Sequence, residues 1–390
     1  MIKSAIWTCF KFSKPNYNYI FGKSDINHTS RLYKKYNIEP ASLDIVKIDF
    51  LLQTEKLSRF IIKEFDILLK KNGIFELLLI NDRSHGLYYR SKDQVKNEFS
   101  ISTNGRYNLV SENVIDNFVK LVYKKNTQTI DDDDNINQWT FGTITNGKNL
   151  EKVDNLIESI VKQNIPFYEI LVCGPYPITG KYYNNEFVKI LPDILLEDDV
   201  RFPISRKKNS IILKAKYKNI SILHDRFFLP DNWFIKMKEY GNYFEYLNLP
   251  TVDEKDNRFM VDWMIFSYPI TRRNFYNKSL NYNKWHEEII VQGGAIIAKK
   301  NLLIENLIDQ RLHWGELEDI HHSKIAFLNG AFFYIDPKNK IISLPVNHIS
   351  RKHSKYLLQT LYILYYFNVI KSFFKFKILI KNYYSNNVTK

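Results

Sequence analysis

The pattern of apolar and polar positions divides the chain into alternating strand-like and helix-like segments. Residues 43–50 read as a strand, and apolar side chains recur at helical spacing over 57–69. Basic residues and a glycine are expected to close that helix, and a buried strand follows at 74–80. Strand, helix and strand in this order predict a small α/β domain over residues 1–125.

A second strand–helix–strand unit follows a polar stretch. The segment 126–138 contains four consecutive aspartates, whose mutual repulsion predicts a linker. Residues 139–145 alternate like a strand, 153–161 carry apolar side chains at helical spacing, and 168–173 form a second apolar run. This order predicts a pair of parallel strands joined by a right-handed crossover.

The apolar run 220–223 ends in His224, Asp225 and Arg226. Strands that are buried on both faces read as continuous apolar runs, and ligands of open α/β sheets lie beyond the carboxyl ends of their strands. We therefore expect Asp225 to face a metal ion and a phosphate. The alternative is a solvated, charged turn at the end of an ordinary strand.

Two later motifs carry further chemistry. Gly293-Gly294 precedes an apolar strand, and glycine permits close approach of the backbone to a ligand. Glu318 and Asp319 follow Trp314-Gly315 and are expected to begin a helix. A carboxylate at a helix N-terminus is stabilised as the anion, which keeps it available as a base. The alternative is an acidic first turn without a chemical role.

The order of these motifs resembles that of GT-A glycosyltransferases of the family 2 type. Trp314-Gly315 followed by Glu318-Asp319 also resembles the Trp-Gly-x-x-(Glu/Asp)-Asp motif of β-1,4-galactosyltransferases. The resemblance implies an α/β fold with a Rossmann-like GT-A core over 139–350. It further implies transfer of a sugar from a nucleotide-diphosphate donor, with a UDP-sugar favoured, to a hydroxyl of a glycan or lipid-linked acceptor. The implied reaction is an inverting displacement in surface polysaccharide synthesis.

The same resemblance assigns roles to individual residues. Asp319 is the implied catalytic base, with Glu318 in reserve, and Trp314 and Trp285 are implied acceptor contacts. Donor contacts are implied for Thr145, Asn146, Lys208, Asn209, Asp225, Arg226, Gly293 and Gly294. The implied ligands of a divalent metal are Asp225, His224 and His348. A set of carboxylate and imidazole suits Mn²⁺ better than Mg²⁺. In a metal-free alternative, Arg226 alone neutralises the phosphates.

The segment LLKKNGIFELLLIND in the first domain resembles the later half of a class I methyltransferase. A glycine-rich strand-to-helix turn that could hold S-adenosylmethionine is missing upstream, which favours a remnant with a structural role. Two alternatives stay open at this point. One is a bifunctional methyltransferase–glycosyltransferase, and the other is a non-catalytic protein that binds nucleotide-sugars or carbohydrates.

Composition and charge add a tail to this picture. The chain has 390 residues, 45% of them apolar, and a net charge of +14. Residues 351–390 hold eight Lys or Arg and no Asp or Glu, so much of the excess charge belongs to a basic, aromatic helical tail and not to a nucleic-acid-binding core. Such a helix is expected on an anionic membrane surface, or packed on its own core or a dimer partner.

The remaining bulk features concern location. Cys9 and Cys173 make no disulfide framework, which favours a reducing compartment. The first residues do not form a signal peptide, and no apolar run reaches the roughly 20 residues that span a bilayer. We expect a cytoplasmic protein, peripheral on the inner face of the membrane if the tail binds lipid. The oligomeric state is left open.

Overall fold

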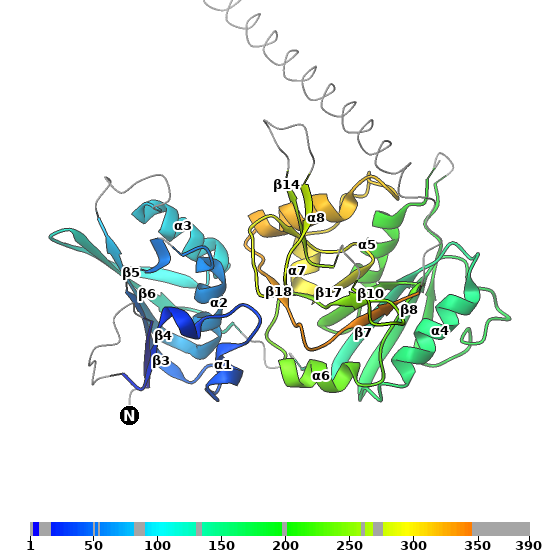
Figure 1. Cartoon of the computed structure of the whole chain (residues 1–390), viewed down its shortest axis with the longest axis horizontal. Helices are drawn as coiled ribbons and strands as arrows, with labels where there is room; N and C mark the ends of the chain where they lie inside the picture. The colour runs from blue at the N-terminus through cyan, green and yellow to red at the C-terminus, as the bar shows by residue number, and fades with distance from the viewer. Residues whose placement is uncertain are drawn as a thin grey trace, which may run out of the picture. The chain divides into compact units, whose positions relative to one another are not determined.

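The computed structural model describes residues 3–7, 17–49, 51–53, 55–81, 90–129, 135–196, 201–258, 262–267 and 276–344. The described residues all belong to one compact unit, which is drawn as a coloured ribbon in Figure 1. The predicted tail, His348 and the run of four aspartates lie outside the described residues. Within the described part, no helix is long and apolar enough to cross a membrane.

The first half of the compact unit is a six-stranded sheet in the order β2-β1-β3-β4-β6-β5. Strands β1 to β4 run parallel, and β6 and β5 are antiparallel to their neighbours. The strands are β1 Ser4–Trp7, β2 Tyr19–Phe21, β3 Leu43–Asp49, β4 Leu69–Ile80, β5 Tyr107–Ile115 and β6 Phe118–Lys125. The helices are α1 Leu32–Lys35, α2 Ser58–Leu68 and α3 Lys92–Ser102, with 3-10 turns at Lys23–Asp25 and Leu51–Gln53.

One predicted boundary in this half is wrong. Gly73 was expected to close the helix, but α2 ends at Leu68 and Gly73 lies inside β4. The chain turns extended at once, because Leu69 already has an extended backbone with φ −82° and ψ 128°. The likeness of this half to a methyltransferase stays a prediction.

The second half is built on a seven-stranded sheet in the order β18-β12-β17-β10-β7-β8-β9. Strands β10, β7, β8 and β9 are parallel, and β17 is antiparallel to both of its neighbours. Its strands are β7 Gln138–Ile144, β8 Phe167–Cys173, β9 Val188–Leu191, β10 Asn219–His224, β12 Tyr246–Asn248, β17 Ala295–Lys299 and β18 Phe333–Ile335. This arrangement confirms the predicted α/β class with a Rossmann-like core.

The strand order reverses between β7 and β10. From β7 the chain runs through helix α4 (Leu150–Val161) to β8 and β9, and then through α5 (Ile204–Lys214) to β10 on the other side of β7. Ligands of doubly wound sheets bind beyond the carboxyl ends of the strands at such a reversal. Ile144 and His224 end the two strands opposite each other, so a ligand is expected at these two ends.

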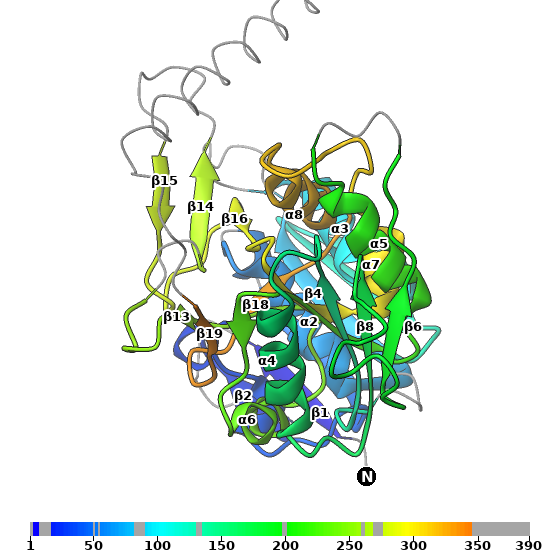
Figure 2. The ribbon, with the colours of Figure 1, turned by 90° about the vertical axis from the view of Figure 1, so that its right-hand side faces the viewer.

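The remaining elements form small additions. β11 Phe227–Phe228, β19 Ile341–Ser343 and β13 Thr251–Val252 make one three-stranded sheet, and β15 Tyr276–Ser279, β14 Met264–Ser267 and β16 Ile289–Ile290 make another. Figure 2 shows β14 and β15 side by side at one margin of the unit. The other helices are α6 Trp233–Tyr240, α7 Lys300–Glu305 and α8 Glu318–Leu328.

The two apolar runs 331–335 and 341–344, separated by Asp336-Pro337-Lys338-Asn339, predict a hairpin in the sequence, and this prediction is wrong. β18 pairs with β12 in the large sheet, whereas β19 pairs with β11 and β13. The turn between them is diverted by Asn339, whose side-chain amide donates to the Trp233 carbonyl at 3.1 Å. As a result β19 lies beside the segment that follows Asp225.

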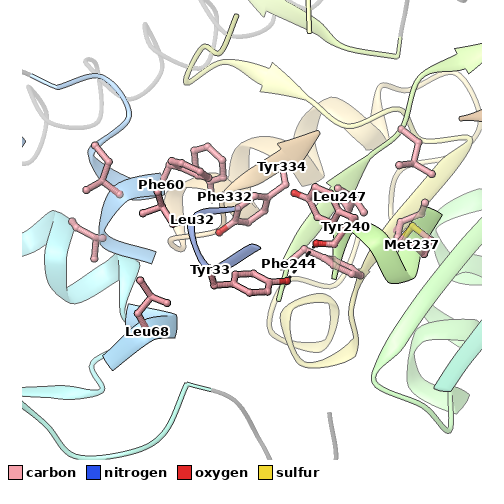
Figure 3. Close-up of a cluster of buried hydrophobic side chains, with 14 of the residues drawn as sticks. Leu32, Tyr33, Phe60, Leu68, Met237, Tyr240, Phe244, Leu247, Phe332 and Tyr334 are labelled. Carbon is pink, nitrogen blue, oxygen red and sulfur yellow. Dashed lines mark hydrogen bonds between the residues drawn. The ribbon is translucent and has the colours of Figure 1, made fainter. Parts of the chain in front are cut away.

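One hydrophobic cluster joins the two halves. The ring of Phe60 from α2 lies 5.2 Å from that of Phe332 and 5.9 Å from that of Tyr334 (Figure 3). The Tyr33 hydroxyl donates to the Tyr240 carbonyl at 3.3 Å. The two predicted domains therefore share buried apolar surface.

A pair of glycine substitutions tests this junction. Gly330 has φ +97°, and a Cβ there would lie 2.5 Å from the Ile101 carbonyl oxygen of α3. Gly105 has φ +67°, and its Cβ would meet no described atom within 4 Å. Because both alanines adopt a left-handed backbone, the difference between them isolates the clash. Gly330→Ala is expected to lower the free energy of unfolding by about 1–3 kcal/mol more than Gly105→Ala. Equal urea midpoints would contradict the close junction.

Candidate active site

The end of β7 presents a threonine and an asparagine at the predicted ligand site. The buried Thr145 donates its backbone N–H to the Cys173 carbonyl at 3.0 Å, which joins the ends of β7 and β8. Its hydroxyl oxygen accepts the Gly147 N–H at 3.0 Å. Asn146 is exposed, and its side-chain oxygen accepts the Lys148 N–H at 3.0 Å. Both residues follow the end of β7 directly, and their contact with a donor stays a prediction.

Lys207 is a residue that the sequence interpretation missed. Its buried ammonium donates to the Thr145 carbonyl at 2.9 Å, pairs with Asp193 and lies 4.4 Å from the centre of the Phe202 ring. Lys207 therefore fixes the backbone at Thr145, directly after the end of β7. The basic run Arg206-Lys207-Lys208 could have pointed to Lys207. However, the two lysines point in different directions only because the run lies inside a helix.

The sequence predicts a basic turn over 204–209 before a helix at 210–217, but Lys208 and Asn209 lie inside α5. The buried Lys208 Nζ lies 3.1 Å from Glu318 Oε1. The Asn209 side chain donates to the Ile308 carbonyl at 2.7 Å and accepts the Ile308 N–H at 3.0 Å. Asn209 therefore holds the segment that leads to Trp314, and we reassign it from donor contact to a positioning role.

The end of β10 places His224, Asp225 and Arg226 in succession. His224 is 7% exposed, and its buried Nε2 has no hydrogen-bond partner among the described residues. Burial, reinforced by the charges of Lys208 and Arg226, holds the pKa of His224 well below its ordinary value, so the imidazole is neutral. Asp225 is half-buried, and this burial raises its pKa against the opposing charges of Lys152 and Arg226.

Gly293 and Gly294 lie between this strand end and the acidic pair. A Cβ at Gly293 would lie 2.9 Å from Asp319 Cβ and 3.0 Å from Glu318 Oε1. A Cβ at Gly294 would lie 2.8 Å from the Phe227 ring and 3.4 Å from Arg226 Nη2. The Gly294 carbonyl also accepts the His224 backbone N–H at 2.9 Å. The two groups of predicted site residues thus meet on either side of the glycine pair.

Glu318 and Asp319 begin α8, as the sequence predicted. The residue before them, Leu317, has φ +62°, a left-handed backbone that disfavours a leucine by about 1–2 kcal/mol. Asp319 accepts the N–H groups of Gly293 at 3.1 Å and Ile320 at 2.9 Å. Burial and then the charge of Glu318 nevertheless raise the pKa of Asp319, against the effect of Lys208 and of these two N–H groups. Asp319 is therefore a stronger base than an ordinary aspartate.

The two tryptophans that were predicted to contact an acceptor differ sharply. Trp314 is 53% exposed, and its ring lies 5.6 Å from that of His224. Trp285 stacks on Phe332 at 5.2 Å and lies near Phe327 at 6.2 Å. Trp314 thus offers an exposed aromatic face beside the site, whereas Trp285 is partly buried and packs against the hydrophobic core.

Two of the three predicted metal ligands, His224 and Asp225, lie among the described residues. The described residues contain no group of three or more His, Cys, Asp or Glu side chains placed to hold a metal ion. A neutral His224 with an unpartnered Nε2 beside Asp225 fits two ligands of a divalent ion. The third predicted ligand, His348, lies outside the described residues. The use of a metal stays a prediction.

Comparison with known proteins gives a likeness in fold. No family model matches the chain, and no curated protein matches it in sequence. The crystal structure of residues 1–349 of TarS from S. aureus is 15% identical, with a TM-score of 0.39 over 53% of this chain and 60% of that chain. Its complex with UDP-GlcNAc is also 15% identical, with a TM-score of 0.38 over 54% and 59%. The match spans less than two thirds of these TarS chains.

Proposed function

We propose that the protein is a glycosyltransferase that moves a sugar from a nucleotide-diphosphate donor to a hydroxyl of a glycan or lipid-linked acceptor. The observation that supports this most is the meeting of two chemical groups at Gly293-Gly294. Asp319, a carboxylate made more basic by its surroundings, lies on one side. The His224-Asp225-Arg226 turn, at the reversal of the strand order, lies on the other.

The reaction that fits this arrangement is a single displacement. Asp319 accepts the proton of the acceptor hydroxyl, and the acceptor oxygen forms a bond to the anomeric carbon. The bond from that carbon to the diphosphate oxygen breaks on the opposite face, so the configuration inverts. Arg226 lies 3.4 Å from the Cβ position of Gly294 and can neutralise the departing diphosphate.

Asp319 is a better candidate for the base than Glu318. The Glu318 carboxylate is buried and lies 3.1 Å from Lys208 Nζ. Taking a proton would leave the Lys208 charge buried without its partner, which is unfavourable. Lys208 therefore engages the Glu318 carboxylate, and the charge of Glu318 in turn makes Asp319 more basic.

A divalent metal would add Lewis-acid stabilisation of the leaving group. His224 and Asp225 are the described residues that would hold it, and His348, the third ligand that the sequence predicts, lies outside the described residues. We further propose that Trp314 packs against the acceptor, and that the basic tail brings the protein to the inner face of an anionic membrane for surface polysaccharide synthesis. UDP-sugars are the first donors to test.

Donor binding can be tested without knowing the acceptor. A ligand that binds only the folded state raises stability by RT ln(1 + [L]/Kd), about 2.7 kcal/mol at 100 times Kd. Thermal unfolding in the presence of a panel of nucleotide-sugars, with and without Mn²⁺, should show a raised midpoint for one nucleotide class. An unchanged midpoint for every donor at millimolar concentration would contradict the proposal.

The pH dependence of turnover follows from the surroundings of Asp319. The facing groups are Glu318, Lys208 and the phenol of Tyr246, whose own pKa is raised by burial and by Asp319. Because Asp319 acts as the anion and its pKa is raised, kcat/KM is expected to fall on the acid side at a pH above the ordinary aspartate value of about 3.9. A profile that stays flat down to that pH would remove Asp319 from the role of base.

Filling the space at Gly293 should impair transfer without unfolding the protein. A Cβ there would displace Asp319, with which it would make a 2.9 Å contact. A shift of about 1 Å in a reacting group can lower the rate by about 100-fold. We expect Gly293→Ala to lower kcat by about 10–100-fold, whereas the control Gly105→Ala should keep the wild-type kcat. Equal kcat values for the two variants would contradict the close packing of Gly293 on Asp319.

A further inference from the structure

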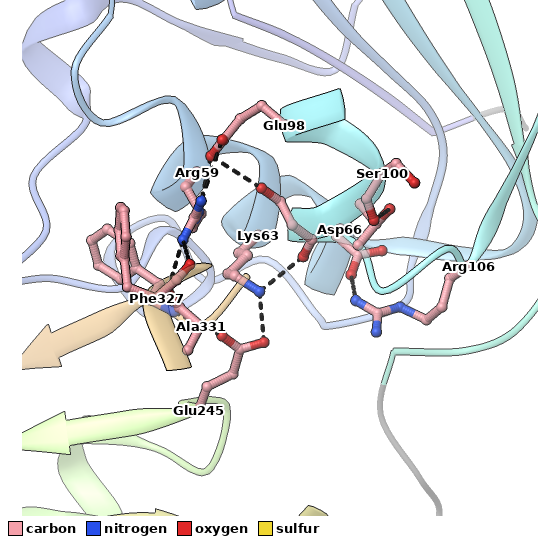
Figure 4. Close-up of polar contacts among 12 residues, drawn as sticks. Arg59, Lys63, Asp66, Glu98, Ser100, Arg106, Glu245, Phe327 and Ala331 are labelled. Atoms are coloured by element: carbon pink, nitrogen blue, oxygen red, sulfur yellow. Dashed lines mark hydrogen bonds and ion pairs between the residues drawn. The ribbon is translucent and has the colours of Figure 1, made fainter. Parts of the chain in front are cut away.

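The turn that follows α8 is held by a residue of the N-terminal half. Arg59 of α2 is 6% exposed, and its guanidinium donates to the carbonyl oxygens of Phe327 and Ala331, the latter at 3.2 Å (Figure 4). The guanidinium carbon also lies 4.0 Å from the centre of the Phe327 ring. A cation at a helix C-terminus is favourable because it satisfies the last carbonyl groups and complements the helix dipole.

Arg59 is itself fixed by a carboxylate from another helix. The Glu98 carboxylate of α3 accepts hydrogen bonds from Arg59 Nε at 2.9 Å and from Arg59 Nη2 at 3.3 Å. This paired contact sets the plane of the guanidinium. Burial alone would raise the pKa of Glu98, but the hydrogen bond and charge of Arg59 bring it below its ordinary value. Two helices of the N-terminal half thus hold one side chain against the end of α8.

A second contact holds the same turn on its other side. Lys63 lies four residues after Arg59 on α2, and its ammonium donates to the Ser102 carbonyl at 2.8 Å and to Glu245 Oε1 at 2.6 Å. Glu245 Oε2 accepts the Phe332 N–H at 3.1 Å. The backbone from Phe327 to Phe332 is therefore fixed at both ends by α2.

We propose that the N-terminal half is a clamp for α8, and that Arg59 is a positioning residue for Asp319. The 11-residue helix carries Asp319 in its first turn and the Arg59 contact in its last. A helix of this length spans about 15 Å and moves as a rod, so release of its C-terminal end shifts its N-terminal end relative to Gly293. The effect on catalysis rests on the function proposed above, whereas the clamp itself does not.

The test compares graded changes at Arg59 in the full chain. Arg59→Met keeps the aliphatic stem and removes the guanidinium, and Arg59→Lys retains a charge without the paired geometry. Arg106→Met is the matched control, because Arg106 pairs with the buried Asp66 in the same half, and none of the contacts described for it involves α8. Amide hydrogen exchange over residues 318–328, kcat and the donor KM are measured for each variant.

For Arg59→Met we expect exchange over 318–328 at least about tenfold faster. We also expect a kcat at least about tenfold lower with an unchanged donor KM, and intermediate values for Arg59→Lys. Arg106→Met should leave exchange in α8 unchanged even where it lowers overall stability. Wild-type exchange in α8 of the Arg59 variants, or the same change in the Arg106 control, would overturn the clamp.

Two further results keep the outcome clear. If Arg59→Met does not fold, Glu98→Gln loosens Arg59 without removing it and should speed exchange over 318–328 in the same direction; unchanged exchange there would overturn the proposal. If the wild-type chain turns over no nucleotide-sugar, the proposed function fails, while hydrogen exchange still decides the clamp.

Discussion

Replacing Asp319 by asparagine is expected to lower the rate of sugar transfer by about 10³-fold, because a positioned general base contributes roughly 10²–10⁴-fold. The asparagine can still occupy the space beside Gly293, so the Kd of the donor should change little. Turnover and equilibrium donor binding are measured on the same preparation. Glu316→Gln is the control, since Glu316 lies in the loop just before α8 but is engaged by the His313 N–H and by Arg201.

The same substitution should raise stability. Because the folded-state pKa of Asp319 is raised, its ionised form opposes folding. This penalty appears as the pH rises from the unfolded value through the folded pKa, and it is fully present above the folded pKa. Asp319→Asn removes it, whereas Glu318→Gln leaves the buried Lys208 without a partner and should destabilise by about 3–5 kcal/mol. A neutral-pH urea titration that gave both variants the same sign would contradict this division of roles.

Replacing Asp225 by asparagine is expected to act on the donor. We predict that Asp225→Asn lowers kcat/KM by about 100-fold or more, because charge stabilisation at the leaving group is lost. Part of the loss should appear as weaker donor binding, in contrast to Asp319→Asn. Any stimulation of the wild type by Mn²⁺ should be lost as well.

The control for this prediction is Asp231→Asn, an exposed aspartate in the same segment after β10. It should leave kcat/KM and donor binding at wild-type values. An Asp225→Asn variant with the wild-type donor Kd and kcat/KM would show that this carboxylate does not meet the donor.

The large sheet could be predicted from the sequence because its central strands are continuous apolar runs. The run 220–223 is continuously apolar, as a strand buried on both faces must be, and it forms the body of β10. The start of α8 at Glu318 was also predicted, since acidic residues favour a helix N-terminus. Because β17 runs antiparallel to β10, the start of β17 lies beside the end of β10. The pair Gly293-Gly294 therefore meets the His224-Asp225-Arg226 turn there.

What the sequence could not give is the direction of individual side chains. Lys207 and Lys208 are adjacent in sequence, yet α5 turns one toward Thr145 and the other toward Glu318. Asn209 carries the residue type of a ligand contact, but both ends of its amide are engaged by Ile308. These contacts join positions 62 to 110 residues apart, and local patterns contain no information on such pairs.

The contact between the two halves could not be predicted from the sequence either, because it depends on residues that are far apart along the chain. The acidic segment 126–138 predicts a linker, and a linker favours independent domains. The structure instead sets Phe60 against Phe332 and Arg59 against the end of α8. The role of the N-terminal half emerges only from these long-range contacts.

The measurement that tests the central claim most directly is the release of UDP from UDP-sugars by the purified chain. It requires no acceptor, because water can take the place of the hydroxyl. We predict UDP release by the wild type from at least one UDP-sugar, and release slowed by about 100-fold or more in Asp319→Asn and in Asp225→Asn. Release at the wild-type rate by both variants, or none by the wild type from any donor of the panel, would contradict the account.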